Sequence, residues 1–258
     1  MITKNELKRI AERRNLSIGN TEKDYLLDIL LFQIYEEYGD LLILKGGTSL
    51  YKLYSLNRFS EDLDFTLNKR RFDTGTFTKK LLRRLALIRI DGKVNKIEDF
   101  GNEINIRLHF KGPLYDGTKQ SLCYIALNIS QRERVLKEPK QELIVPSSRE
   151  IPSFRIFAMD ENEIAAEKVR AIMTRNKARD VYDLWFLMKR GIMPRISMIN
   201  RKLKLYGLSF SLEKFSKSID EKKKSWGTDL QGLVIGDLID FKKVRDEVIA
   251  KFREVSTG

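Results

Sequence analysis

The chain of 258 residues is 42% hydrophobic, and its 49 Lys and Arg residues outnumber its 36 Asp and Glu residues, for a formal net charge of +13 that favours polyanions such as nucleic acid as partners. No run of about 18 apolar residues is present and the charged start lacks an apolar segment, so neither a membrane span nor a secretory signal is indicated and a cytoplasmic protein is expected. A single cysteine, Cys123, and a single histidine, His109, exclude an internal disulfide and a zinc site of the usual Cys/His type, so any metal ion would be held by carboxylates.

Residues 1–159 are expected to form a lobe rich in strands. The spacing of apolar residues predicts a helix over 21–40, with Thr21 as its cap and Gly39 at its end. The further elements expected in this lobe are a buried strand over 41–44, a helix over 48–56, a strand over 61–67, an amphipathic helix with a basic outer face over 73–90, and strands over 93–100, 103–110, 121–129, 141–146 and 154–160.

From Asp160 onward the pattern becomes helical. Helices are expected over 160–175, 178–191, 196–207, 211–219 and 235–255. The sequence therefore predicts an α+β fold, in which a mixed sheet flanked by helices forms a lobe over 1–159 and a helical C-terminal lobe covers 160–258.

Two aspartates lie one residue apart in the stretch "EDLDFTL". On a strand, Asp62 and Asp64 point to the same face while Leu63 and Phe65 anchor the other face in the core. Two carboxylates this close repel each other unless a divalent cation lies between them, and Mg²⁺ prefers such hard oxygen ligands. Taken alone, an Asp-x-Asp pair is more often a solvated surface feature.

A glycine pair precedes this strand in the stretch "LLILKGGTSLYKLY". Gly46 and Gly47 allow a tight turn after the buried strand, so that Thr48 and Ser49 open a helix whose free N–H groups face an anion. Thirteen residues separate Thr48 from Asp62. A phosphate site and a metal site are therefore expected side by side.

This combination is similar to the core of the nucleotidyltransferase superfamily that includes DNA polymerase β. Four stretches, "LKGGTSLYKLY", "RFSEDLDF", "AAEKVRAI" and "KARDVYDLWFL", together resemble the nucleotidyltransferases of the AbiEii/AbiGii toxin family. The resemblance implies a polymerase β-like lobe, with a C-terminal lobe that completes the active site. It also implies transfer of a nucleoside monophosphate from a nucleoside triphosphate to a hydroxyl acceptor, with Mg²⁺ or Mn²⁺. Relatives of this kind act on the tRNA 3′ end, as toxins of toxin–antitoxin or phage abortive-infection systems, so tRNA or another RNA and a cognate antitoxin are the expected partners.

By the same resemblance, Asp62 and Asp64 are the expected metal ligands and catalytic acids. The nucleotide's phosphates are expected at Gly46, Gly47, Thr48 and Ser49, and Ser60, together with Arg58, is expected to support the nucleotide-binding loop that presents the acid pair.

The helical half supplies three further candidates. Lys168 emerges from a largely apolar helix face and, by the resemblance, neutralises the triphosphate charge. Asp180 and Asp183 share one face of the next helix. Asp183 is the first choice for the family's catalytic acid, whether as proton acceptor or as support for the metal site, and Asp180 is the alternative, with Arg175 or Arg179 as its potential partner.

The stretch "YIALNISQRERV" departs from the polymerase β pattern. Asn128 stands where relatives tend to carry a third carboxylate, which leaves two alternative functions open: a catalytically inactive nucleotide- or RNA-binding module, or a nucleotidyltransferase that acts on a protein or a small molecule. Basic residues concentrate over 130–140 and 79–89. They are expected to form either a track for an RNA backbone or a solvated basic surface.

Overall fold

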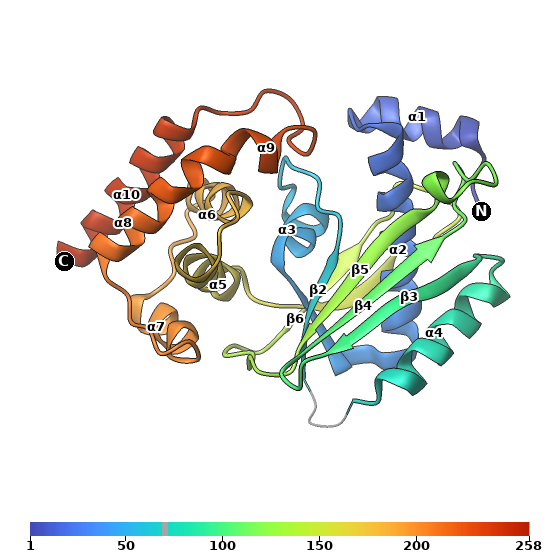
Figure 1. Ribbon diagram of the computed structural model, residues 1–258, viewed down its shortest axis with the longest axis horizontal. Helices are drawn as coiled ribbons and strands as arrows, with labels where there is room; N and C mark the ends of the chain where they lie inside the picture. Colours follow the sequence, from blue (N-terminus) through green and yellow to red (C-terminus); the bar gives the residue numbers. More distant parts are fainter. Residues whose placement is uncertain (69–71, 258) are drawn as a thin grey trace. The chain divides into compact units, whose positions relative to one another are not determined.

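The computed structural model describes residues 1–68 and 72–257, which form two compact units. Unit 1 comprises 1–54, 59–135 and 139–158, and unit 2 comprises 55–58, 136–138 and 159–258. Each unit therefore contains segments that are distant in sequence. Figure 1 shows the elements in chain order.

Unit 1 is built on a mixed seven-stranded sheet with the order β3-β4-β5-β2-β1-β7-β6. Its β1 and β7 are parallel, as are β2 and β5, and the other neighbours are antiparallel. The strands are β1 (Leu42–Lys45), β2 (Leu63–Leu67), β3 (Gly92–Asp99), β4 (Glu103–Phe110), β5 (Cys123–Ser130), β6 (Lys140–Ile144) and β7 (Phe154–Ala158). The predicted α+β fold class with a mixed sheet is confirmed.

The helices of unit 1 are α1 (Lys4–Arg14), α2 (Ile18–Tyr38), α3 (Gly46–Tyr54) and α4 (Thr74–Leu87), with short 3-10 turns at Gly39–Leu41 and Lys119–Ser121. Along β5, Cys123, Ile125, Leu127 and Ile129 are buried on the face that α2 covers, whereas the alternate residues are more exposed. This alternation buries one face of β5 and leaves the other more accessible, whereas β1 is buried throughout.

One expectation for these helices needs correction. The α2 helix is capped by Ser17, whose hydroxyl accepts a hydrogen bond from the Asn20 N–H, and Thr21 lies inside the helix with its hydroxyl donating to the Ser17 carbonyl. On α4, Lys80 and Arg84 pair with Glu37 of α2, which places this part of the basic helix in the layer of α2 on the covered face. The RNA track over 79–89 and 130–140 stays a prediction.

Unit 2 is helical. Its elements are α5 (Glu161–Thr174), α6 (Arg179–Lys189), α7 (Ile196–Lys204), α8 (Leu212–Asp220), a 3-10 turn (Glu221–Ser225), α9 (Trp226–Leu230) and α10 (Phe241–Thr257). The helix expected from Ile235 begins only at Phe241, because the Asp240 carboxylate accepts from the Lys242 and Lys243 N–H groups and ends the preceding loop. None of the described helices has the length and apolar character that a bilayer crossing requires.

Candidate active site

The glycine turn lies directly after β1, and α3 begins there. Gly46 has a φ of +71°, a left-handed conformation that favours glycine. A Cβ atom at this position would lie 2.7 Å from Oδ2 of Asp64. Glycine is therefore required both by the backbone conformation and by the close approach of the Asp64 carboxylate.

The hydroxyl residues of this turn face inward. Thr48 and Ser49 are fully buried, and the Thr48 hydroxyl donates a hydrogen bond to the backbone carbonyl of Asp62. Thr48 thus fixes the backbone at Asp62 from the start of α3. The N–H groups of the first turn of α3 have no partner within the helix, as in any α-helix, and they are the groups that can face an anion. Ser60, also buried, lies on the connection that leads to Asp62.

Asp62 and Asp64 both reach towards β5. Asp64 belongs to β2, and Asp62 directly precedes that strand's first residue, Leu63, which is fully buried together with Phe65. Oδ1 of Asp62 accepts a hydrogen bond from the Ala126 N–H at 3.3 Å. Burial and the neighbouring Asp64 carboxylate raise the pKa of Asp62 above its ordinary range. The pair is therefore destabilised as two bare charges, and a cation beside it would relieve that cost.

Asn128 lies beside Asp64 on the adjacent strand. The two residues are in register between the parallel strands β2 and β5, and the Asn128 amide donates a hydrogen bond to Oδ1 of Asp64 at 3.0 Å. This position on β5 is where a third carboxylate would face the pair. Within the described residues, no third carboxylate, histidine or cysteine joins Asp62 and Asp64.

The two oxygens of each of these carboxylates differ in their hydrogen bonding. One oxygen of each carboxylate accepts a hydrogen bond from β5, and no other described residue hydrogen bonds to the second oxygen of either. Two anionic oxygens without protein donors match the preference of Mg²⁺ for a few carboxylate ligands completed by water and phosphate. The residues present therefore fit a divalent cation.

Sequence reasoning missed Lys45, which lies opposite Asp64 in the antiparallel β1–β2 pair. Its ammonium group is buried and ion-paired with Glu133, which is also buried. Cross-strand partners share a face of a sheet, so Lys45 places a positive charge beside the acid pair. The only signal in the sequence was a lysine at the end of an otherwise apolar run, and nothing indicated its partner.

A buried ion-pair network in unit 2 contains the three candidates from the helical half. The Nζ atom of Lys168 lies 3.0 Å from Oδ1 of Asp180 and 2.6 Å from Oδ2 of Asp183. Arg58 donates to Asp183 from both Nε and Nη2, each at 2.6 Å. Arg175 donates to both oxygens of Asp180. The expected pairing of Asp180 with Arg175 is present.

The two carboxylates of this network are compensated by contact with three cationic side chains, of which Arg175 is 55% exposed. Burial alone would raise the pKa of Asp183, but Arg58 and Lys168 outweigh it, and the pKa lies below its ordinary value. The same holds for Asp180, where Lys168 and Arg175 lower the pKa against the effect of burial. Both acids are therefore held as carboxylates, and each of the four oxygens accepts from a cationic side chain.

Comparison with known proteins decides the family. The model of the family described as "Nucleotidyl transferase AbiEii toxin, Type IV TA system" matches residues 29–247, which is most of the chain. The chain belongs to this family. It is accordingly a nucleotidyltransferase toxin of a toxin–antitoxin system, with a nucleoside triphosphate as the substrate that the family implies. The resemblance stated from the sequence is confirmed.

The chain is also similar to individual proteins. An uncharacterized protein of Aquifex aeolicus (strain VF5) is 25% identical over 205 residues, which cover 80% of this chain and 76% of that protein. The crystal structure of JHP933 from Helicobacter pylori has a TM-score of 0.59 at 23% identity and covers 94% of this chain and 95% of that one. MenT4, the nucleotidyltransferase toxin Rv2826c from Mycobacterium tuberculosis H37Rv, has a TM-score of 0.66 at 19% identity and covers 99% and 90%. These two likenesses show the fold.

Proposed function

We propose that this toxin transfers a nucleoside monophosphate from a nucleoside triphosphate to the 3′ end of tRNA, with Mg²⁺ or Mn²⁺ held by Asp62 and Asp64. The observation that carries the proposal is the hydrogen bonding of the carboxylate oxygens of Asp62 and Asp64. One oxygen of each carboxylate is fixed by β5, and the other is left without a protein donor beside the glycine turn. Asp62 and Asp64 would hold the cation, which when bound would supply charge neutralisation for the triphosphate and lower the pKa of the acceptor hydroxyl.

The phosphates bind at the start of α3. The proposed donors are the backbone N–H groups of Gly46, Gly47, Thr48 and Ser49, which have no partner within the helix, whereas the Thr48 hydroxyl already donates to the Asp62 carbonyl. A side chain at Gly46 would fill the space between this turn and Asp64. The Thr48 hydroxyl and Ser60 support the backbone of the Asp62 segment and act through it.

The role of Lys168 in neutralising the triphosphate is proposed from the family resemblance alone, and within unit 2 Asp180 and Asp183 hold its ammonium group. Phosphoryl transfer is catalysed mainly by positioning and charge neutralisation. Asp183 has both oxygens occupied by Arg58 and Lys168, and its lowered pKa makes it a poor proton acceptor. Its role is therefore to hold Arg58 and Lys168 in place, and Asp180 has the same role for Lys168 and Arg175.

The family context supports the biological setting. A type IV toxin–antitoxin toxin is expected to act in the cytoplasm, where triphosphates and tRNA occur, and to be countered by a cognate antitoxin. The net charge of +13 favours a polyanionic acceptor over a protein or a neutral small molecule.

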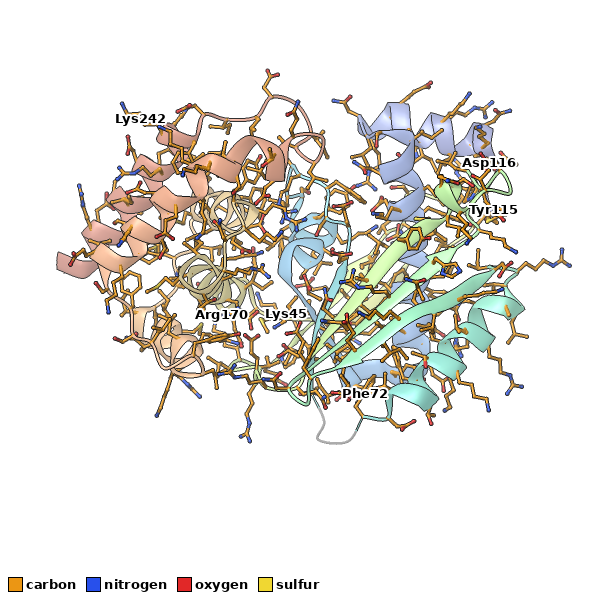
Figure 2. All side chains as sticks on the ribbon, in the orientation of Figure 1. Lys45, Phe72, Tyr115, Asp116, Arg170 and Lys242 are labelled. Carbon is orange, nitrogen blue, oxygen red and sulfur yellow. The ribbon has the colours of Figure 1, made fainter. Side chains whose placement is uncertain are left out.

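The test is incubation of the protein with each α-³²P-labelled triphosphate, Mg²⁺ and total tRNA, beside Asp62→Ala. Asp116→Ala is the matched control, because Asp116 is an exposed acid on the β4–β5 loop of the same unit (Figure 2). The proposal requires labelled tRNA with the wild type and the control, and none with Asp62→Ala. Label on a protein or small molecule, or RNA binding without labelling, overturns it in favour of the two alternatives.

A further inference from the structure

The accessible face of β3, β4 and β5 carries aromatic and cationic side chains. Figure 1 shows these strands from the side away from α2. Tyr124 of β5 is 47% exposed and lies opposite His109 of β4, with their ring centroids 5.9 Å apart. Arg107, the next residue of β4 on this face, lies opposite Ala126 of β5. On the other side of β4, Lys93 and Lys96 of β3 lie opposite His109 and Arg107.

The cationic side chains of this face remain exposed to solvent. The side chains of Arg107 and Lys96 are 57% and 58% exposed, and Lys93 is exposed as well. Glu98 shares the face and pairs with Lys96 at 2.6 Å, but its contact with Arg107 is at the 4.0 Å limit of an ion pair. Nδ1 of His109 is enclosed without a hydrogen-bond partner among the described residues. The face thus offers an exposed ring beside cations that retain donors.

This face begins at the acid pair. The Ala126 N–H that binds Asp62 lies on the same strand as Tyr124, two residues along, which is about 7 Å in a β-strand. The phosphate turn follows β1, on the opposite side of β2 in the strand order. The Asp62–Asp64 pair is therefore flanked by the phosphate turn on one side and by Tyr124, His109 and Arg107 on the other.

In phosphoryl transfer, the attacking and leaving oxygens lie roughly in line on opposite sides of the phosphorus. If the pyrophosphate leaves from the glycine turn, the acceptor hydroxyl must come from the side of β5. We propose that the β3–β4–β5 face binds the unpaired 3′-terminal nucleotides of an RNA acceptor, with a base stacked on Tyr124 and backbone phosphates bound by Arg107, Lys96 and Lys93. This inference rests on the proposed function and adds the acceptor site to it.

The chemistry of the face selects a single strand. An exposed aromatic ring beside cationic side chains is the arrangement by which proteins bind splayed RNA bases and their phosphates, whereas the stacked bases of a duplex cannot reach such a ring. Of the acids near this face, Glu98 and Glu103 align with Asn105 and Ser130, and Asp91, beside Lys93 and His109, is paired with Lys111 at 2.6 Å. The cationic part of the face is therefore the part nearest Asp62.

The test is the binding of a fluorescein-labelled 12-nucleotide single-stranded RNA, measured by anisotropy without triphosphate. Tyr124→Ala is expected to weaken binding about 5- to 150-fold, the range found for loss of one base–aromatic stack. Arg107→Ala is expected to lower the slope of log K against log salt by about 0.7, as for one phosphate contact on a single strand. Phe100→Ala is the control, since Phe100 is a more exposed aromatic (62%) at the β3–β4 turn, and should leave binding unchanged.

The outcomes separate this inference from the proposed function. Asp62→Ala should abolish transfer while it keeps the affinity for the single strand. Unchanged affinity of Tyr124→Ala, or equal binding of a blunt duplex of the same sequence, overturns the acceptor site while transfer by the wild type still stands. Thermal unfolding of each variant confirms that the fold is retained, and Arg107→Ala gives an independent reading should Tyr124→Ala unfold.

Discussion

Arg58 holds Asp183 through two parallel hydrogen bonds of 2.6 Å, one to each carboxylate oxygen, and both side chains are almost completely buried. Lys168 contacts the same carboxylate from α5. A buried charge of this kind is tolerated because each partner replaces the water that the other has lost. Removal of Arg58 therefore leaves the Asp183 carboxylate with Lys168 but without its bidentate partner, and removal of Asp183 takes this carboxylate away from the buried Arg58 guanidinium.

Arg58→Met is expected to lower the free energy of unfolding by about 3–5 kcal/mol, the usual effect of breaking a buried ion pair. Urea denaturation at pH 7 measures it. The control is Arg245→Met, whose ion pair with Asp220 is exposed and should contribute about 0–1 kcal/mol. Similar losses in the two variants would contradict the importance assigned to the buried pair.

Gly46→Ala is expected to abolish nucleotide transfer, because the new Cβ would displace the Asp64 carboxylate from its place 2.7 Å away. Gly101→Ala separates this effect from backbone strain, since Gly101 has a similar φ of +77° with nothing within 4 Å of its Cβ position. Both variants should lose about 1–2 kcal/mol of stability from the left-handed conformation. Transfer assays and denaturation of the same samples distinguish the two causes, and full activity of Gly46→Ala would refute the close packing described.

Asn128→Asp is expected to place a third carboxylate against Asp64. Without a cation, repulsion between the acids should lower the thermal unfolding temperature, and saturating Mg²⁺ should restore it. Asn105→Asp, on the neighbouring strand β4, is the control and should respond less to Mg²⁺ because Asn105 is one strand further from Asp64. The measurement is thermal unfolding with EDTA and with increasing Mg²⁺; an equal Mg²⁺ response in both variants would argue against a cation at the pair.

Asp28 gives the stability of unit 1 a dependence on pH. Burial raises its pKa to about 6, while Lys52 opposes the rise and Asp24 adds to it. Between pH 3.8 and about 6, the native state holds a proton on Asp28 and the unfolded chain does not. The resulting contribution to the free energy of unfolding is therefore fully present below pH 3.8 and is lost as the pH rises through about 6. The loss is expected to be about 1–3 kcal/mol.

Urea midpoints between pH 4.5 and 7.5 test this dependence, and Asp28→Asn should remove it, whereas Glu213→Gln, at an exposed position on α8, should not. Asp180 and Asp183 act in another window, because their lowered pKa values make their contribution disappear only as the pH falls below the ordinary range of aspartate. A pH dependence that persists unchanged in Asp28→Asn would assign it to other groups.

The local patterns of the sequence were sufficient for most elements and for the pairing of motifs. Alternation of apolar residues predicted β2, where Leu63 and Phe65 are fully buried, and the glycine pair predicted the turn before α3. Helix ends were harder to predict, because more than one residue near the start of a helix can act as its N-cap. Ser17 begins α2 although Thr21 fits the same pattern, and α1, with few apolar residues, was not expected at all.

The contacts between distant segments could not be obtained from the sequence. Lys45 pairs with Glu133, 88 residues away, and Arg58 with Asp183, 125 residues away. Neither pairing follows from helix or strand spacing, since it depends on the strand order and on which segments pack together. The open face of β3, β4 and β5 was also missed, because alternation along a strand does not show which of its two faces a helix covers.

The division of the chain has a practical consequence for dissecting the protein. Residues 55–58 lie within the sequence of the sheet unit but pack with the helical unit, as do residues 136–138, whose N–H groups at Leu136 and Lys137 donate to Glu163. A gene truncated after residue 158 would encode the whole sheet. The Arg58 guanidinium and the Leu136 and Lys137 N–H groups would then lack the carboxylates of Asp183 and Glu163, which accept their hydrogen bonds in the intact chain. Split reporters, domain swaps and antitoxin-binding fragments are therefore better made from the intact chain, with the interleaved segments left in place.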